Sequence, residues 1–71
     1  MFSIHYNLKD IRKAKGLTLE ELEELSEVPK STINYIEHDN TDPTLGTLIR
    51  LSRALEVDLL RLFTITEIDI I

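Results

Sequence analysis

The sequence predicts an all-α fold organised around two short helices joined by a tight turn. Residues 18–26 and 29–37 have apolar side chains at three- and four-residue intervals, a spacing typical of amphipathic helices. Thr18 and Glu21 have the spacing of a capping box, which begins a helix, and Pro29 suits the first position of the next helix. This arrangement predicts a helix-turn-helix motif.

The chain has 71 residues and fits a single domain, residues 1–71, with a helical core over 8–63. Its composition, 42% hydrophobic and 30% charged, is typical of a soluble globular protein, and the absence of cysteine excludes disulfides and thiolate metal sites. No apolar run reaches the roughly 18 residues of a membrane span, and residues 1–9 lack the apolar segment of a secretory signal. We therefore expect a cytoplasmic protein with no membrane partner.

The formal net charge of −5 argues against nonspecific binding of polyanions. The charges are segregated, however. Acids crowd into the first helix of the motif and bases into the segment before it: Glu20, Glu21, Glu23, Glu24 and Glu27, against Lys9, Arg12, Lys13 and Lys15. The net value therefore hides a local basic end, and the local distribution decides whether DNA can bind.

The segment before the motif predicts a short strand and a helix. Residues 2–6 alternate apolar and polar as a half-buried strand does. Asn7 can cap a helix that begins at Leu8, and Gly16 suits the left-handed residue that ends it.

The C-terminal half predicts two more helices and an apolar tail. A polar loop, residues 39–43, leads to a helix capped by Thr44 and then to a final helical turn capped by Asp58. The apolar face of the longer helix comprises Leu45, Leu48, Leu51 and Leu55. The tail, residues 64–71, is rich in β-branched residues, and it either packs back on its own domain or is buried against another chain.

A two-stranded ribbon formed by residues near 2–6 and 64–70 fits the first of these alternatives. An isolated hairpin is only marginally stable in water. We therefore predict that the ribbon or the final helix takes part in a twofold dimer, with residues 64–71 as the dimerisation arm or strand.

The order and spacing of these residues resemble the phage-repressor/Cro-type helix-turn-helix family, the lambda-repressor-like DNA-binding domains, over about Leu8 to Phe63. The resemblance rests on the combined positions of Leu17-Thr18, Glu21-Leu22, Val28, Ser31-Thr32-Ile33, Ile36-Glu37, Pro43, Leu48, Ala54-Leu55 and Val57. It implies a five-helix, repressor-like all-α bundle whose third helix enters the major groove of DNA.

The resemblance also implies roles for individual residues. In the third helix, the positions facing base edges are Lys30, Ser31, Asn34 and Tyr35, and those beside phosphates are Thr32 and His38. The chemistry is suitable, because lysine donates to guanine, asparagine pairs with adenine, serine bonds either kind of base edge, and a tyrosine ring can contact a thymine methyl group. Arg12 and Glu37 resemble a partly buried ion pair that ties the first helix to the third.

Several positions depart from the family pattern. Leu19 stands where a glutamine usually contacts phosphate, Glu23 where a small alanine is usual, and Glu27 where the turn usually has glycine. An acidic loop, residues 39–42, replaces a glycine and basic residues. A positive φ at Glu27 would cost roughly 1 kcal/mol, and the loss of phosphate contacts motivates an alternative to DNA binding.

Catalysis has little support in the sequence. The glutamates lie on an exposed helix face, and the chain has neither a glycine-rich phosphate loop nor a nucleophile elbow. His5 and His38 lack the further ligands and the spacing that a metal site needs. We therefore expect no enzyme activity, no metal and no small-molecule cofactor.

We interpret the chain as a sequence-specific DNA-binding transcriptional regulator, a repressor that binds a near-palindromic operator in double-stranded DNA as a homodimer. The first alternative is a helix-turn-helix protein-interaction module, antitoxin-like or anti-repressor, with weak DNA binding. The second is a purely structural dimerisation unit, in which the outward face of the third helix is ordinary solvated surface. Tyr35 is the most informative residue, because an exposed aromatic side chain within a polar face often marks a contact.

Overall fold

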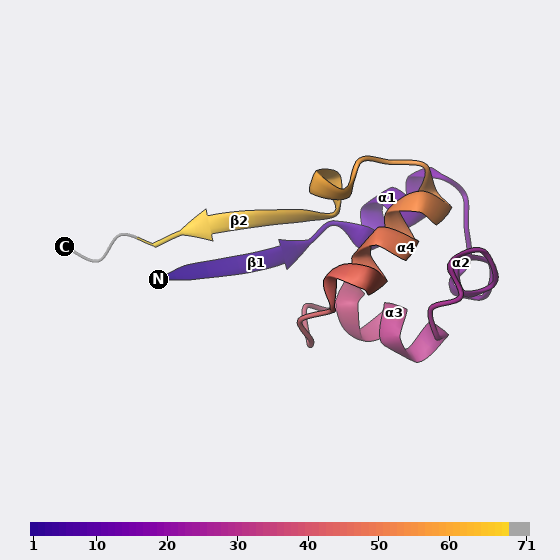
Figure 1. The fold of residues 1–71 in the computed structure, drawn as a ribbon, viewed down its shortest axis with the longest axis horizontal. Coiled ribbons are helices and arrows are strands. Elements are labelled where there is room, and N and C mark those ends of the chain that lie inside the picture. The colour runs from indigo at the N-terminus through magenta and orange to yellow at the C-terminus, as the bar shows by residue number, and fades with distance from the viewer. Residues whose placement is uncertain (69–71) are drawn as a thin grey trace.

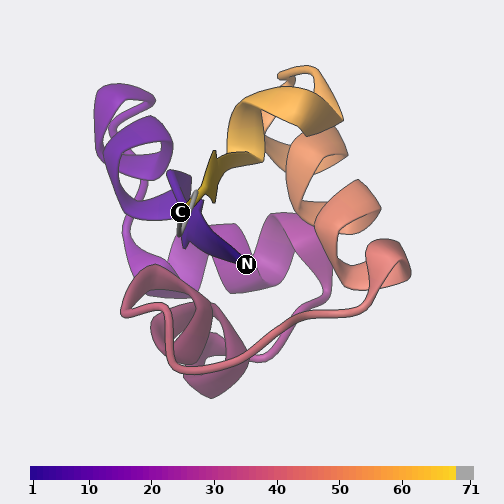
Figure 2. The same ribbon diagram turned by 90° about the vertical axis from the view of Figure 1, so that its left-hand side faces the viewer.

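The computed structural model describes residues 1–68 and consists of a helical body from which a two-stranded ribbon projects (Figure 1). The elements, in chain order, are β1 (Phe2–Tyr6), α1 (Leu8–Ala14), α2 (Leu19–Ser26), α3 (Lys30–Glu37), α4 (Leu45–Leu55), the 3-10 turn η1 (Leu59–Leu62) and β2 (Phe63–Glu67). Seen along the ribbon, the helices surround its base (Figure 2), and the N-terminus lies at the end of the ribbon that points away from the helices (Figure 1). None of the described helices is long and apolar enough to cross a membrane.

The prediction of a five-helix, all-α bundle is wrong in its helix count, because the fifth element is a single 3-10 turn. The Asp58 carboxylate does cap this turn, accepting from the backbone N–H of Leu60 at 2.9 Å. The turn nevertheless ends at Leu62, since Phe63 is already extended and the β-branched residues after it favour a strand. Over residues 1–68 the fold is therefore of the helix-turn-helix type, with four α-helices and a small antiparallel sheet.

The predicted ribbon is present. Strands β1 and β2 pair antiparallel from Phe2↔Glu67 to Tyr6↔Phe63. β2 begins one residue before the predicted strand, and residues 69–70 of that prediction lie outside the described residues. Since directly paired residues share a face of a sheet, the register separates the ribbon into two faces. The apolar ribbon face comprises Phe2, Ile4, Tyr6, Phe63 and Ile65, with Glu67 at its tip, and the polar ribbon face comprises Ser3, His5, Thr64 and Thr66.

The core lies where the helices meet, and every helix contributes to it. The fully buried side chains are Leu8, Leu22, Ile33, Ile36, Leu51, Leu55 and Leu62. The prediction for the apolar face of α4 is correct for Leu48, Leu51 and Leu55 and wrong for Leu45, which is 62% exposed. Leu45 is the first residue of α4, and it lines an open pocket instead of joining the core.

The helix ends show which of the predicted capping residues form the expected hydrogen bonds. The capping box is confirmed, because Thr18 Oγ1 accepts from the Glu21 N–H at 3.1 Å and Glu21 Oε1 accepts from the Thr18 N–H at 2.9 Å. The predicted cap at Asn7 is wrong. Its side-chain amide instead donates to the Arg61 carbonyl at 3.2 Å and to Thr64 Oγ1 at 3.1 Å, so it joins α1 to β2.

Candidate nucleic-acid interface

The turn between α2 and α3 fixes the direction in which α3 runs. Glu27 is left-handed, with a φ of 60°, and its N–H donates to the Glu23 carbonyl at 2.8 Å. The buried Ser26 hydroxyl donates to the Leu22 carbonyl at 2.6 Å and accepts from the Val28 N–H at 3.2 Å. These bonds satisfy the polar groups of the turn inside the body, which favours a single orientation of α3.

Helix α3 has one buried face and one exposed face. Ile33 and Ile36 are fully buried and hold the helix in the core. The predicted base-edge positions are all exposed: Lys30, Ser31, Asn34 and Tyr35. Tyr35 is 55% exposed, so neither the core nor a neighbouring helix absorbs its ring.

The two residues expected beside phosphates occupy different environments. Thr32 is half-buried, at the boundary between the two faces of α3. His38 directly follows α3 and is exposed, and its Nδ1–H donates to the Asn34 carbonyl at 2.8 Å. The structure thus brings the six predicted residues together on α3 and its C-terminal end, with Thr32 the least accessible.

Acidic side chains of α2 occupy the N-terminal end of α3, which sequence reasoning missed. Glu23 Oε2 accepts from the Lys30 backbone N–H at 2.7 Å. It thereby supplies the cap that Pro29, at the N-cap position, cannot supply with its own side chain. The Lys30 ammonium also lies 3.9 Å from Glu20 Oε1, in an exposed pair. The one signal in the sequence is the unusual glutamate at position 23, where the family pattern has a small residue.

Arg12 and Glu37 join α1 to the C-terminal end of α3. Arg12 Nε–H donates to Glu37 Oε2 at 2.6 Å, and its Nη2 donates to Oε1 at 3.0 Å, which makes the pair bidentate. A third donor, Nη1, bonds the Leu17 carbonyl at 2.8 Å. The hydrogen bond to Glu37 is the main cause that raises the pKa of Arg12 above its ordinary value. One of the four clustered bases therefore serves the fold and is not available to a ligand.

Asp39 joins the end of α3 to β1. It is left-handed, with a φ of 56°, a conformation that aspartate tolerates better than most residues. Its Oδ1 accepts from the Tyr6 N–H at 2.9 Å, and its Oδ2 accepts from His5 Nδ1–H at 2.7 Å. The Tyr6 N–H, followed by the His5 hydrogen bond, lowers the pKa of Asp39 below its ordinary value. The predicted loop therefore begins with a residue that fixes the ribbon to the body.

Metal-binding geometry is not found within residues 1–68, where no three His, Cys, Asp or Glu side chains are placed to hold an ion. His5 bonds to Asp39, and His38 bonds to a carbonyl of α3. What the exposed face of α3 offers is recognition chemistry: hydrogen-bond donors and acceptors and one aromatic ring on a helix of fixed orientation.

Comparison with known proteins finds relatives along most of the chain. The family model HTH_3, helix-turn-helix, matches residues 8–62. The HTH-type transcriptional regulator y4dJ of Sinorhizobium fredii, an uncharacterized protein, is 36% identical over 61 residues, which cover 86% of this chain and 79% of y4dJ.

Two solved structures have a similar fold. The restriction-modification controller protein C.AhdI from Aeromonas hydrophila has a TM-score of 0.74 at 29% identity, over 78% of this chain and 83% of that chain. An HTH_3 family transcriptional regulator from Vibrio cholerae has a TM-score of 0.71 at 34% identity, over 75% of this chain but only 30% of that chain. The likeness thus covers most of C.AhdI and less than a third of the Vibrio protein.

Proposed function

This chain belongs to the HTH_3 helix-turn-helix family of transcriptional regulators, and from that premise we propose that it is a sequence-specific DNA-binding repressor that acts as a homodimer. The observation that supports this most is the division of α3 into two faces. Ile33 and Ile36 hold it in the core, and its opposite face is polar and exposed. A helix held in this way can enter the major groove with its polar side chains toward the base edges.

Each exposed residue of α3 has a plausible base partner by chemistry. Lys30 can donate to guanine O6 or N7, and Asn34 can form a bidentate pair with adenine. Ser31 can bond either kind of base edge, and the ring of Tyr35 can contact a thymine methyl group. A well-formed bidentate pair contributes about 1–3 kcal/mol of discrimination against the wrong base, so a few such contacts are enough to define a sequence.

Phosphate contacts would be few, which sets the expected strength of binding. Thr32 and His38 are the candidates on α3, and the lysines of the basic segment, Lys9, Lys13 and Lys15, remain exposed. Arg12 is already paired with Glu37. The hydroxyl of Thr32 carries no charge, so the cations that could neutralise phosphates are the three lysines and Lys30. Three or four neutralised phosphates would give a log–log salt slope of about −3 to −4, which is moderate for a specific DNA-binding protein.

The operator follows from the symmetry that we propose. In a twofold dimer the two α3 helices would contact half-sites about 34 Å apart, one turn of DNA, so the operator would be near-palindromic. Occupying a promoter is enough to repress it. We also propose the phage-repressor/Cro-type subgroup, because Arg12 and Glu37 meet at the positions that this resemblance implies. Such a regulator would work in the cytoplasm with its DNA.

A protein-interaction module is the second candidate, and the acidic residues of α2 favour it. Glu23 bonds the first N–H of α3, and Glu20 lies beside Lys30. Negative charge at this end of α3 opposes the approach of phosphates. A basic or apolar surface of another protein would meet no such repulsion.

Salt dependence separates the two candidates. Fluorescence anisotropy with a duplex chosen from a random pool should give a log–log slope of about −3 to −4 between 50 and 200 mM salt. Lys30→Ala and Tyr35→Ala should each weaken binding of that duplex at least tenfold. Leu60→Ala, at an exposed position of η1, should bind like the unmodified protein. A slope near zero, or equal binding by all four proteins, would rule out the proposed role of α3.

A further inference from the structure

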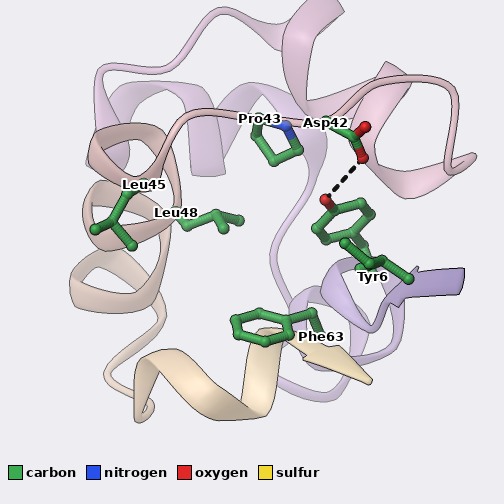
Figure 3. A pocket seen from close by; sticks show the side chains of 7 residues that line it. Tyr6, Asp42, Pro43, Leu45, Leu48 and Phe63 are labelled. Carbon is green, nitrogen blue, oxygen red and sulfur yellow. Dashed lines mark hydrogen bonds between the residues drawn. The ribbon is translucent and has the colours of Figure 1, made fainter. Parts of the chain in front are cut away.

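An apolar surface runs from the ribbon onto the body, and it is open to solvent. It includes a pocket of about 280 Å³ between the base of the apolar ribbon face and the start of α4 (Figure 3). Ile4, Tyr6 and Phe63 line the ribbon side, and Pro43, Leu45 and Leu48 line the other. Two polar side chains also line the pocket: the Tyr6 hydroxyl donates to Asp42 Oδ1 at 3.3 Å.

The same surface continues outward to the tip of the ribbon. Phe2 is 61% exposed and Ile65 is 55% exposed, and both lie on the apolar ribbon face. The other side of the ribbon, the polar ribbon face, is suited to water. The apolar ribbon face is therefore the side of the ribbon that would gain from burial. Within residues 1–68 only its base, at Tyr6, is buried.

We propose that a second copy of this chain covers this surface, with the two apolar ribbon faces packed against each other and antiparallel. The twofold axis would pass near the Ile4–Ile65 pair, and the tip of each ribbon, with Phe2, would reach the pocket of the other copy. This inference rests on the homodimer of the proposed function and names the surface that forms it.

The length of the ribbon fits this arrangement. Four residue steps separate Phe2 from Tyr6, which at about 3.3 Å per residue is roughly 13 Å from tip to pocket. Rotation about the midpoint therefore exchanges the tip of one copy with the pocket of the other. Such an interface is isologous, because each copy supplies both the inserted side chain and the pocket that receives it. The helical bodies would then lie at opposite ends of the paired ribbons.

The middle of the apolar ribbon face is the part of this surface that carries no charge. With a formal charge of −5 each, two copies repel over most of their surfaces. The apolar ribbon face is uncharged except for Glu67 at the open end of β2, and Asp42, which accepts from the Tyr6 hydroxyl, is the charged residue that lines the pocket. In the antiparallel arrangement Glu67 of each copy would lie near Asp42 of the other, so these two contacts oppose dimerisation and the apolar contacts between them must outweigh the repulsion.

The area indicates a reversible dimer. An aromatic side chain has about 150–250 Å² to bury, so the exposed 61% of Phe2 amounts to roughly 100 Å². The apolar ribbon face and the pocket rim together offer several hundred Å² per copy, at or below the roughly 800 Å² of a standard interface. We therefore expect a monomer–dimer equilibrium that depends on protein concentration.

Two neighbouring residues of β2 provide the test. Ile65→Asp changes the apolar ribbon face, and Thr66→Asp places the same charge on the polar ribbon face. Sedimentation from 1 µM to 500 µM should show dimers for the unmodified chain and for Thr66→Asp. Ile65→Asp should weaken dimerisation at least 100-fold. Equal dimerisation by the two variants, or an unmodified chain that stays monomeric at 500 µM, would overturn the inference.

A cysteine pair of variants keeps the inference testable if Ile65→Asp fails to fold. The chain has no cysteine of its own. Under mild oxidation, Ile65→Cys should form a covalent dimer much faster than Thr66→Cys, since only the former lies at the proposed twofold axis. Equal rates would contradict this interface. A dimer that sediments as expected but binds no duplex would contradict the DNA-binding proposal and leave the interface standing.

Discussion

Arg12 of α1 and Glu37 of α3 form a bidentate ion pair with side chains only 9% and 2% exposed. Both charges have lost most of their water, so their attraction is offset by the cost of desolvation. The larger effect of the pair is on geometry. It fixes the C-terminal end of α3 to α1, while Ile33 and Ile36 fix the middle of the helix in the core.

Removal of one partner of this pair should be costly. Glu37→Leu leaves the Arg12 guanidinium buried without its carboxylate, and we expect a loss of about 3–5 kcal/mol in the free energy of unfolding. The double variant Arg12→Met/Glu37→Leu should recover much of that loss, because no uncompensated charge remains. Urea denaturation of the two single variants and the double variant measures the coupling, and additive losses would contradict the pair as described.

Replacing Glu27, the left-handed residue of the turn, with glycine should increase the stability of the protein. Glu27 has a φ of 60°, a conformation that strains an L side chain, so Glu27→Gly should stabilise the protein by about 0.5–1 kcal/mol. Glu24→Gly, inside α2, is the matched control and should lose about 1 kcal/mol. Thermal unfolding of both variants is the measurement. A lower unfolding temperature for Glu27→Gly would show that its side chain stabilises the turn in some other way.

Asp39 should make stability depend on acid pH. Its pKa is lower in the folded protein than the ordinary value of 3.8, so its stabilising effect is present above that value and is lost as the pH falls through the folded pKa. Asp39→Asn keeps a residue that tolerates a left-handed backbone and removes the titration. We expect lower stability at pH 7 and a flatter loss of stability between pH 5 and 2, measured by urea midpoints. Asp10→Asn, at an exposed position, serves as the control, and an unchanged acid profile for Asp39→Asn would contradict the role of this carboxylate.

The glutamates of α2 that lie beside the N-terminal end of α3 should weaken DNA binding. Glu20→Gln and Glu23→Gln together remove two negative charges beside Lys30. On the proposed function, duplex affinity should rise several-fold at low salt, because repulsion of phosphates is relieved. Glu24→Gln is the control. It removes one charge from the same helix at an exposed position, and among residues 1–68 the Glu24 side chain forms no hydrogen bond or ion pair. If Glu24→Gln raised duplex affinity equally, the effect would come from net charge alone and not from the position of Glu20 and Glu23 beside Lys30.

Local patterns were sufficient where a feature depends on neighbouring residues. The capping box at Thr18 and the burial of Ile33 and Ile36 follow from spacing within one helix. The role of Asn7 could not be predicted in this way. An asparagine before a helix has the pattern of an N-cap even when its side-chain amide is hydrogen-bonded to a distant strand, as it is here to Thr64. The same holds for β2, whose start at Phe63 depends on pairing with a segment at the other end of the chain.

In the candidate site, too, local sequence predicts some features and others depend on the tertiary structure. Helical periodicity alone predicts that Asn34 and Tyr35 are exposed. The cap that Glu23 provides to Lys30 depends on the geometry of the whole turn, so no short pattern indicates it. The pocket beside Tyr6 forms from three separate segments, and it becomes visible only when these are assembled.

Selection of random duplexes on the purified protein tests the central claim most directly, because it assumes no operator. The unmodified chain should enrich one motif with two inverted half-sites about 10 base pairs apart. Asn34→Ala should alter or lose that motif, whereas Leu60→Ala should retain it. A pool without enrichment from a folded protein, or the same motif after Asn34→Ala, Lys30→Ala and Tyr35→Ala, would contradict the claim that the exposed face of α3 reads DNA.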